Sequence, residues 1–467
     1  FDRSLTNPIE IKSLDKNNPA SFSEVHLRGV SDYKFSDLVF DYNFSALDPS
    51  YFRPFTFDYC SNIQILDSQF EGDVASGISE AADGYGYAYG LSVRGSENVV
   101  VSGNEFLNWN RAAIFTETRG LYISQNDVHS IRSDGFDFAQ VSNVILERNY
   151  FHDFIISPKS GDHCDYIQFW TTGTSEPSQN ISIRENILDI GNGGVTQSIF
   201  MRNGEVDSGN AGFELYYQNI VIEQNLILGS HSHGITVGET SGLLIQGNTV
   251  LAAPNPDSTI NIPIINVAQE SVSVTIVQNA VAKINGYSSQ ADWSVSGNAF
   301  IQNTDPNAPG YYSDIFVESS MFGPNGVIDY VVAPGSMLYN LEAGYKGLFS
   351  FASSQSVRAL FDVSTSADDI GFLIIDGRYS FGSGGTSLPD GSTFLWKLNT
   401  GETFSGPVLI HRFDSPGHYD VELVVTTPDG SSSVAFASVS VAGQDLLSFD
   451  ETTGSFLAFG YGETGTI

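Results

Sequence analysis

Basic residues are scarce in this sequence, which has 20 Lys and Arg against 54 Asp and Glu in 467 residues. The formal net charge of −34 argues against nucleic acid as a partner, because phosphates are bound through basic patches. It argues equally against unassisted binding to anionic membranes. The sequence also lacks a run of 18 apolar residues, so no segment is expected to span a membrane.

Cysteine is rare too, since Cys60 and Cys164 are the only two in the chain. The repeat described below places them four or five coils apart, whereas a disulfide needs Cα atoms within about 7 Å of each other. Both thiols are therefore expected to be free. The sequence also lacks a nucleotide-binding glycine loop, a serine nucleophile elbow and a zinc-binding helix motif.

A short phrase recurs through the first 300 residues: two apolar residues at alternate positions, followed three residues later by Asn. The phrase ends at Asn104, Asn126, Asn149, Asn186, Asn225 and Asn248, with weaker copies at Asn279 and Asn298. The first three copies are separated by 22 and 23 residues, a period typical of a solenoid. We therefore expect an all-β fold, a right-handed parallel β-helix over residues 1–302. Its asparagines should stack in an internal ladder.

Two coils are longer than the others. Asn149 and Asn186 are 37 residues apart, and Asn186 and Asn225 are 39 apart. The extra residues, roughly 151–165 and 203–215, are expected to form loops. Insertions in a solenoid gather on one face, which is often the binding face.

Aligning the coils predicts three columns of outward-facing side chains on one sheet, because neighbouring residues of a strand point to opposite faces. The first column contains Tyr89, Arg111, Asp134, Asp165, Gln197 and His233. The second contains Ser92, Ile114, Asp137, Gln168, Phe200 and Thr236. The third contains Arg94, Thr116, Trp170 and Arg202. His163 and His231 precede the first column by two residues and should share its face.

This patch is the predicted active site. Stacked carboxylates about 4.8 Å apart repel each other, so a protein retains them where a raised pKa or a bound cation is useful. The candidate catalytic residues are His163, Asp165, His233, Asp134, Asp137 and Arg202. The candidate substrate-binding residues are Arg111, Gln168, Trp170, His231, Tyr166 and Lys159. Asp134 and Asp137 are also candidate ligands of a cation such as Ca²⁺.

Residues 90–250 resemble coils of mannuronan C5-epimerases. Asp134-Gly135-Phe136 and His233-Gly234-Ile235-Thr236-Val237, each followed by an Asn phrase, carry the resemblance. The catalytic Asp-Pro-His segment that follows Tyr-Gly-Phe in those epimerases is absent here. The stretch Pro8 to Phe40 is similar to the first coils of β-helical alginate and chondroitin lyases.

Polygalacturonases offer a second, weaker resemblance. Their motifs are Asn-Thr-Asp, Asp-Asp, Gly-His-Gly and Arg-Ile-Lys. The nearest stretches here are Ser133-Asp134-Gly135, Asp162-His163-Cys164-Asp165 and Ser232-His233-Gly234, with an additional coil between them. No Arg-Ile-Lys follows.

Residues 356–442 resemble the PKD module. Phe394-Leu395-Trp396-Lys397, His411-Arg412-Phe413 and Pro416-Gly417-His418-Tyr419 carry this resemblance. It implies an immunoglobulin-like β-sandwich that acts as a spacer or polymer-binding module in secreted enzymes. The alternating strand pattern of Tyr419 to Val425 supports a sandwich independently. Residues 303–355 are expected to be an irregular connection, and 443–467 the start of a further segment.

These features favour a lyase or C5-epimerase that acts on a uronate-containing polysaccharide such as alginate. That reaction needs a group that neutralises the uronate carboxylate, a base for the C5 proton and an acid. One alternative is a glycoside hydrolase that uses two of Asp134, Asp137 and Asp165 as acid and base. The other is a non-catalytic carbohydrate-binding adhesin. Each of these would act outside the cell.

The first prediction concerns the independence of the second domain. Residues 356–442 should fold alone, and deleting them should leave the turnover of a short oligosaccharide largely intact, because the candidate residues all lie in the β-helix. Circular dichroism of the isolated module and turnover by the deletion variant are the measurements. Complete loss of oligosaccharide turnover would show that the module shapes the active site.

Overall fold

The computed structural model divides the chain into two compact units, residues 1–349 and 350–467. It describes residues 8–15, 18–253, 262–316, 330, 332–333, 335–349, 357–359, 361–365, 372–378, 380–382, 388–413 and 417–441. Each unit is considered by itself below.

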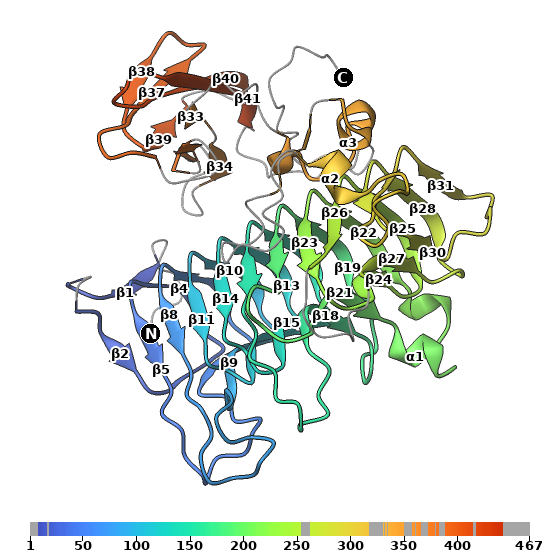
Figure 1. Cartoon of the computed structure of the whole chain (residues 1–467). Coiled ribbons are helices and arrows are strands. Elements are labelled where there is room, and N and C mark those ends of the chain that lie inside the picture. Colours follow the sequence, from blue (N-terminus) through green and yellow to red (C-terminus); the bar gives the residue numbers. More distant parts are fainter. Residues whose placement is uncertain are drawn as a thin grey trace. The chain divides into compact units, whose positions relative to one another are not determined.

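The first unit is built from three long parallel sheets, here called sheets A, B and C (Figure 1). Sheet A contains β1 (Ile9–Lys12), β4 (Ser31–Ser36), β7 (Ser61–Leu66), β10 (Glu97–Ser102), β13 (Arg119–Ser124), β16 (Ser142–Glu147), β19 (Gln179–Arg184), β22 (Tyr217–Glu223), β25 (Thr240–Gln246), β28 (Val272–Val277) and β31 (Trp293–Ser296). Sheet B contains β2 (Ser21–Phe22), β5 (Val39–Asp41), β8 (Gln69–Glu71), β11 (Glu105–Leu107), β14 (Asp127–His129), β17 (Tyr150–His152), β20 (Ile187–Asp189), β23 (Leu226–Gly229), β26 (Thr249–Ala252), β29 (Ala280–Val281) and β32 (Ala299–Phe300). Sheet C contains β3 (Val25–Arg28), β6 (Phe55–Asp58), β9 (Tyr89–Arg94), β12 (Arg111–Thr116), β15 (Asp134–Ala139), β18 (Asp165–Trp170), β21 (Gln197–Arg202), β24 (His233–Val237), β27 (Ile264–Val267) and β30 (Ile284–Asn285).

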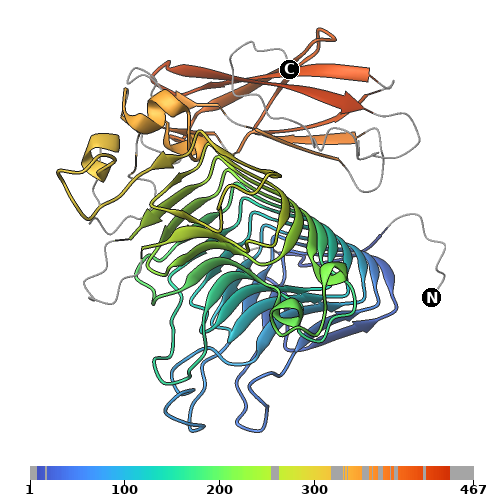
Figure 2. The same ribbon diagram turned by 90° about the vertical axis from the view of Figure 1, so that its right-hand side faces the viewer.

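Each coil passes through sheets A, B and C in turn, and each strand pairs with the equivalent strands of the coils before and after it. Figure 2 shows the coils stacked in layers. Inward side chains fill the interior in rows; for example, the rings of Phe40, Phe70 and Phe106 stack with successive centroid distances of 4.4 and 4.6 Å. The predicted parallel β-helix is therefore confirmed.

The predicted asparagine ladder is also confirmed. The side chain of Asn126 donates to Asn149 Oδ1 at 2.8 Å, and the side chain of Asn149 donates to Asn186 Oδ1 at 2.9 Å. Each Oδ1 also accepts the backbone N–H of the preceding asparagine. The row continues through Asn225, Asn248, Asn279 and Asn298. Buried amides are thus satisfied along the axis, where an unpaired one would cost stability.

Residues after the last coil pack against the β-helix. The segment carries α2 (Tyr312–Ile315), α3 (Met337–Leu341) and a 3₁₀ turn, η3 (Lys346–Leu348). Its apolar side chains share a core with outward-facing residues of sheet B such as Leu228 and Leu251. The described part of 303–349 therefore covers an apolar strip of the solenoid, although its sequence has no repeat. Both cysteines are buried and free, as expected.

The second unit contains antiparallel strands around a buried Trp396, the arrangement expected of a PKD-like sandwich. One sheet joins β38 (Thr403–Ser405), β37 (Thr393–Leu398), β40 (Gly417–Thr426) and β41 (Ser432–Val441). Another joins β34 (Asp362–Thr365), β35 (Phe372–Asp376) and β39 (Val408–Arg412), and a third pairs β33 (Val357–Arg358) with β36 (Phe381–Gly382). The further segment predicted for 443–467 lies outside the described residues.

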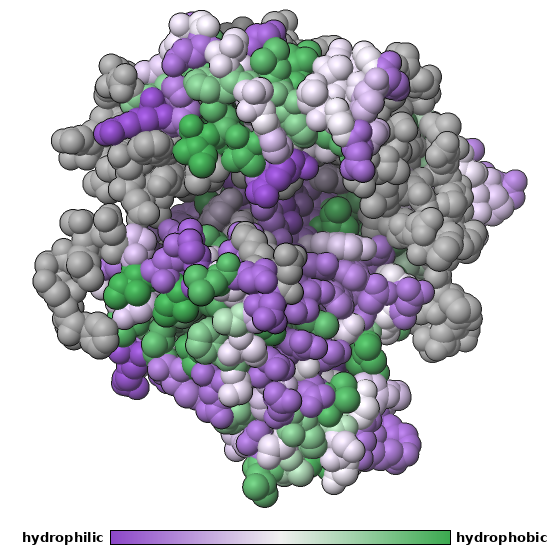
Figure 3. Space-filling model, turned by 90° about the vertical axis from the view of Figure 1, so that its left-hand side faces the viewer, coloured by the Kyte–Doolittle hydropathy of each residue, from purple (hydrophilic) through white to green (hydrophobic). Residues whose placement is uncertain are grey.

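Hydrophobic and hydrophilic side chains are mixed on the surface of the protein. On the face shown in Figure 3, hydrophobic groups occur in clusters among hydrophilic ones. In the part of the chain that the structure describes, no helix is long and apolar enough to cross a membrane.

The second prediction concerns the asparagine ladder. Asn186→Ala should lower the free energy of unfolding by about 3 kcal/mol, because it leaves the buried Asn149 N–H and Leu146 C=O without their partner. Urea unfolding is the measurement. The control is Asn180→Gly, which removes an exposed asparagine amide from the same coil at a positive φ that glycine tolerates. Equal destabilisation by both variants would show that the ladder contributes no special stability.

Candidate active site

Most of the candidate residues lie on the outward face of sheet C, in the predicted columns. The register pairs Arg111 with Asp134, and Asp165 with Gln197. It aligns the second column through Asp137, Gln168 and Phe200 in the same way. The alignment of the coils therefore predicted these columns correctly.

Loops stand at both ends of the sheet C strands. Residues 153–164 precede β18, while α1 (Gly204–Asp207) and the 3₁₀ turn η1 (Phe213–Leu215) lie between β21 and β22. Two further loops, 42–54 and 72–88, precede β6 and β9, and sequence reasoning did not single them out. The early loops project from the same side of the β-helix as 153–164 (Figure 1). An ion pair between Lys159 and Glu80 ties 72–88 to 153–164.

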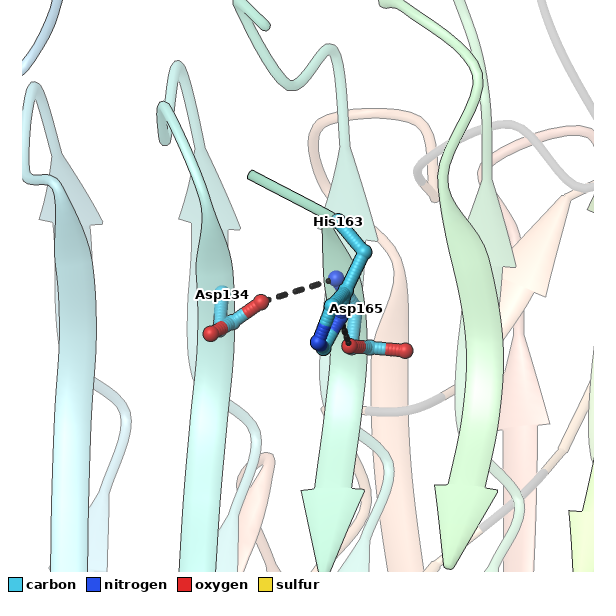
Figure 4. A group of neighbouring side chains, drawn as sticks. All are labelled: Asp134, His163 and Asp165. Atoms are coloured by element: carbon cyan, nitrogen blue, oxygen red, sulfur yellow. Dashed lines mark hydrogen bonds and ion pairs between the residues drawn. The ribbon is translucent and has the colours of Figure 1, made fainter. Parts of the chain in front are cut away.

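His163 and Asp165 form the centre of the site (Figure 4). The carboxyl of Asp165 is fully buried, and its Oδ2 lies 2.8 Å from Nδ1 of His163. Gln168 donates to the same oxygen at 2.9 Å. The His163 side chain is itself 61% exposed. A buried carboxylate thus orients an imidazole that solvent and a ligand can reach.

Arg111 holds the other two carboxylates. Its guanidinium lies 3.0 Å from Asp134 Oδ2 and 2.6 Å from Asp137 Oδ2, and both carboxylates are fully buried. The other oxygen of Asp134 accepts the backbone N–H of Asp165 at 3.1 Å. Arg111, Asp134 and Asp165 are therefore linked directly from coil to coil.

Burial dominates the electrostatics of the three carboxyls. Desolvation raises the pKa of Asp134 well above its usual value, and the nearby Asp137 raises it further. Burial also raises the pKa of Asp137, to about 6, although Arg111 opposes the shift. The pKa of Asp165 is raised by burial against the hydrogen bond from His163. That hydrogen bond in turn raises the pKa of His163.

The cluster has more buried acceptors than donors. Asp137 Oδ1, Asp165 Oδ1 and Gln197 Oε1 have no hydrogen-bond partner among the described residues. Buried polar atoms are normally paired, and exceptions concentrate at functional sites. The unpaired acceptors favour a site that exchanges protons or binds a cation.

His231, His233 and Phe200 continue the site along the axis. The ring centroids of His163 and Phe200 are 6.3 Å apart, those of Phe200 and His233 are 5.0 Å apart, and those of His233 and His231 are 5.0 Å apart. His233 Nδ1 lies 2.7 Å from Thr236 Oγ1. Burial lowers the pKa of both His231 and His233, so these imidazoles favour the neutral form. The Phe200 ring thus lies between the imidazoles of His163 and His233.

The remaining candidates lie around this cluster or beneath it. Arg202 is 64% exposed, and its Nε lies 2.8 Å from Asp207 in α1. Trp170 is half-buried and pairs in register with Arg202. The prediction that Tyr166 binds substrate is wrong. Its side chain is fully buried in the interior next to Phe154, and its hydroxyl donates to the Asp189 carbonyl at 3.0 Å.

One group of residues has the spacing of a metal site. The ligand atoms of Asp134, His163 and Asp165 all lie within 4.8 Å of one another. This set shares Asp134 with the predicted pair but contains His163 and Asp165 in place of Asp137. A histidine with two carboxylates suits zinc or manganese better than calcium, which prefers oxygen ligands throughout.

Comparisons with known proteins agree with this architecture. A family model described as "Right handed beta helix region" matches residues 87–305, and one described as "PKD domain" matches residues 378–439. The chain is thus a right-handed parallel β-helix followed by a PKD-like sandwich. No curated protein matches it in sequence.

Three solved structures illustrate the likeness. The Dettilon tailspike protein is 13% identical, with 88% of this chain and 68% of that chain covered and a TM-score of 0.41. A double mutant of the periplasmic alginate epimerase AlgG is 13% identical, with 63% and 67% covered and a TM-score of 0.36. The PKD1 domain of Vibrio anguillarum Epp is 21% identical, with 19% and 94% covered and a TM-score of 0.16. Likeness at this level says nothing of which reaction this chain performs.

The third prediction concerns the stability cost of the buried carboxyls. Because folding raises the pKa of Asp137 from its ordinary value of 3.8 to about 6, the folded state binds more protons than the unfolded state between these pH values. Stability therefore falls as the pH rises through this window. Asp137→Asn should raise the melting temperature at pH 7 and should do so less at pH 4.

Thermal melts at several pH values test this expectation. Asp314→Asn, at an exposed position, is the control and should leave the melting temperature unchanged at both ends of the range. A lower melting temperature for Asp137→Asn at neutral pH would show that the ion pair with Arg111 outweighs the desolvation of Asp137.

Proposed function

We propose that the β-helix is a secreted polysaccharide lyase or C5-epimerase that acts on a uronate-containing polymer such as alginate. The observation that carries the proposal is the pairing of an exposed His163 imidazole with the fully buried carboxylate of Asp165 at 2.8 Å. Both reactions begin with removal of the proton from C5 of a uronate. Among side chains, histidine most often acts as a general acid or base in catalysis.

The proposed roles follow from which groups are accessible. Asp165 accepts the hydrogen bond of Nδ1–H and so leaves Nε2 of His163 as the atom that takes the C5 proton. Arg111 is half-buried beside His163, and it supplies positive charge where the uronate carboxylate becomes enolate-like. Asp134 and Asp137 hold that guanidinium in place. In a lyase the C4–O4 bond then breaks and the departing O4 takes a proton from the protonated His163 or from water, whereas in an epimerase water delivers a proton to C5 from the opposite face.

A glycoside hydrolase is the second candidate. The pKa of Asp137, raised to about 6, suits a carboxylic acid that protonates a leaving group near neutral pH. However, the three carboxyls are fully buried beneath Arg111, Gln168 and His163, so a sugar would first meet those side chains. Because His163 is exposed and the carboxyls are buried, the lyase or epimerase is favoured over the hydrolase.

The second domain is proposed to serve the same polymer. Residues 356–442 would act as a spacer or polymer-binding module, since a PKD-like sandwich with its own core can hold the β-helix near an extended substrate. The suggested boundaries of the catalytic region are residues 1–302, to which the described part of 303–349 adds an apolar cover.

The fourth prediction tests the function with a panel of purified polysaccharides. A lyase will produce the ultraviolet absorbance of a C4–C5 double bond, and an epimerase will exchange the C5 proton with deuterated water without cleavage. His163→Ala should lower turnover at least about 100-fold, because it removes the proposed base. Asp165→Asn should also lower turnover without changing the shape of the site.

His152→Ala is the matched control, because His152 also lies 2.8 Å from an aspartate but belongs to sheet B. Its turnover should equal that of the unmodified protein. New reducing ends without a double bond would indicate the hydrolase instead. Full turnover by His163→Ala would remove His163 from the reaction.

A further inference from the structure

A continuous line of side chains runs along the outward face of sheet C. Its cationic end begins at Arg53, whose guanidinium carbon lies 5.7 Å from the centroid of the Tyr89 ring. The guanidinium carbon of Arg111 lies 5.5 Å from the same centroid. From Arg111 the line continues through the buried carboxylates to His163 and then to the neutral rings of Phe200 and His233. The two ends of the line therefore differ in charge.

Arg53 is the cation at which this line begins. It is exposed, it lies between β5 and β6 in the loop 42–54, and no carboxylate of the described residues is within ion-pair distance of it. Arg28 also has no ion-pair partner among the described residues, but only Arg53 shares its tyrosine ring with Arg111 at the active-site column. The Tyr89 ring holds Arg53 by a cation–π contact, which fixes the guanidinium without neutralising its charge.

We propose that Arg53, held over the Tyr89 ring, forms a subsite that binds the carboxylate of a further uronate unit of the same polymer. The inference rests on the proposed function. Arginine suits this task because its planar guanidinium forms paired hydrogen bonds with a carboxylate. The Tyr89 ring supplies an apolar face on which a sugar can also pack.

The spacing of the strands places this subsite away from the reacting sugar. Arg53 lies over Tyr89 in β9, and His163 precedes β18, three strands further along sheet C. Paired strands are about 4.8 Å apart, so the separation is about 15 Å, the length of a few sugar units. Only oligomers long enough to reach from His163 to Arg53 should use the subsite.

The experiment compares Arg53→Gln with the unmodified protein on alginate and polygalacturonate oligomers of graded length. Isothermal titration calorimetry measures binding, with a neutral xylan oligomer as the uncharged probe. For long uronate oligomers Arg53→Gln should bind about tenfold more weakly, and for disaccharides it should bind equally well. The difference should shrink as salt is added. Arg53→Lys should restore part of the affinity.

Arg28→Gln is the matched control. Arg28 is also exposed and lies 4.9 Å from a tyrosine ring, that of Tyr59, but at the other end of the sheet C strands. Its affinity should be unchanged. Equal binding of long uronate oligomers by Arg53→Gln and the unmodified protein would overturn the subsite and leave the proposed function standing. If the unmodified protein bound xylan as tightly as the uronates, or bound neither uronate, both proposals would fail.

Discussion

Hydrogen bonds between buried asparagines fix how each coil of the β-helix lies on the next. The amide of Asn149 accepts the backbone N–H of Asn126 and donates to Asn186, so a slip of one residue would break both contacts. Such a slip would also turn every inward side chain of that coil outward. Because the register is fixed, Arg111, Asp134 and Asp165 from three coils form one column on sheet C.

That column gathers charge in a place where charge is costly. Asp134, Asp137 and Asp165 are fully buried with Arg111 as their only arginine partner in the described residues, and burial raises the pKa of each. The core asparagines, by contrast, are fully paired along their ladder. The β-helix thus combines a satisfied interior with an outward face whose carboxyls are strained electrostatically, the division expected of a stable scaffold that carries a reactive site.

The chain as a whole is strongly acidic, but the line of side chains along sheet C has a cationic end and an uncharged end. One end of the line holds Arg53 and Arg111, and the centre holds His163. The other end holds Phe200 and His233. Under the proposed function, a local cationic end would let an acidic protein bind an acidic polymer at short range, while its overall charge opposes non-specific contact. The direction of the line along the axis matches an extended chain.

The sequence alone determined the parallel coils, the asparagine row and the columns that contain His163, Asp165 and Arg111, because solenoid register follows from a local repeat. It did not single out Arg53 or the loops 42–54 and 72–88, which lie where the Asn phrase is absent. Tyr89, at the head of the first column, was the one sign that the site extends toward these loops. Sequence did not determine which outward groups would be accessible. Only the tertiary structure showed that the carboxyls are buried, that Tyr166 faces the interior and that Arg202 pairs with Asp207. Exposure depends on side chains and loops brought together from distant coils, and no local pattern encodes those contacts.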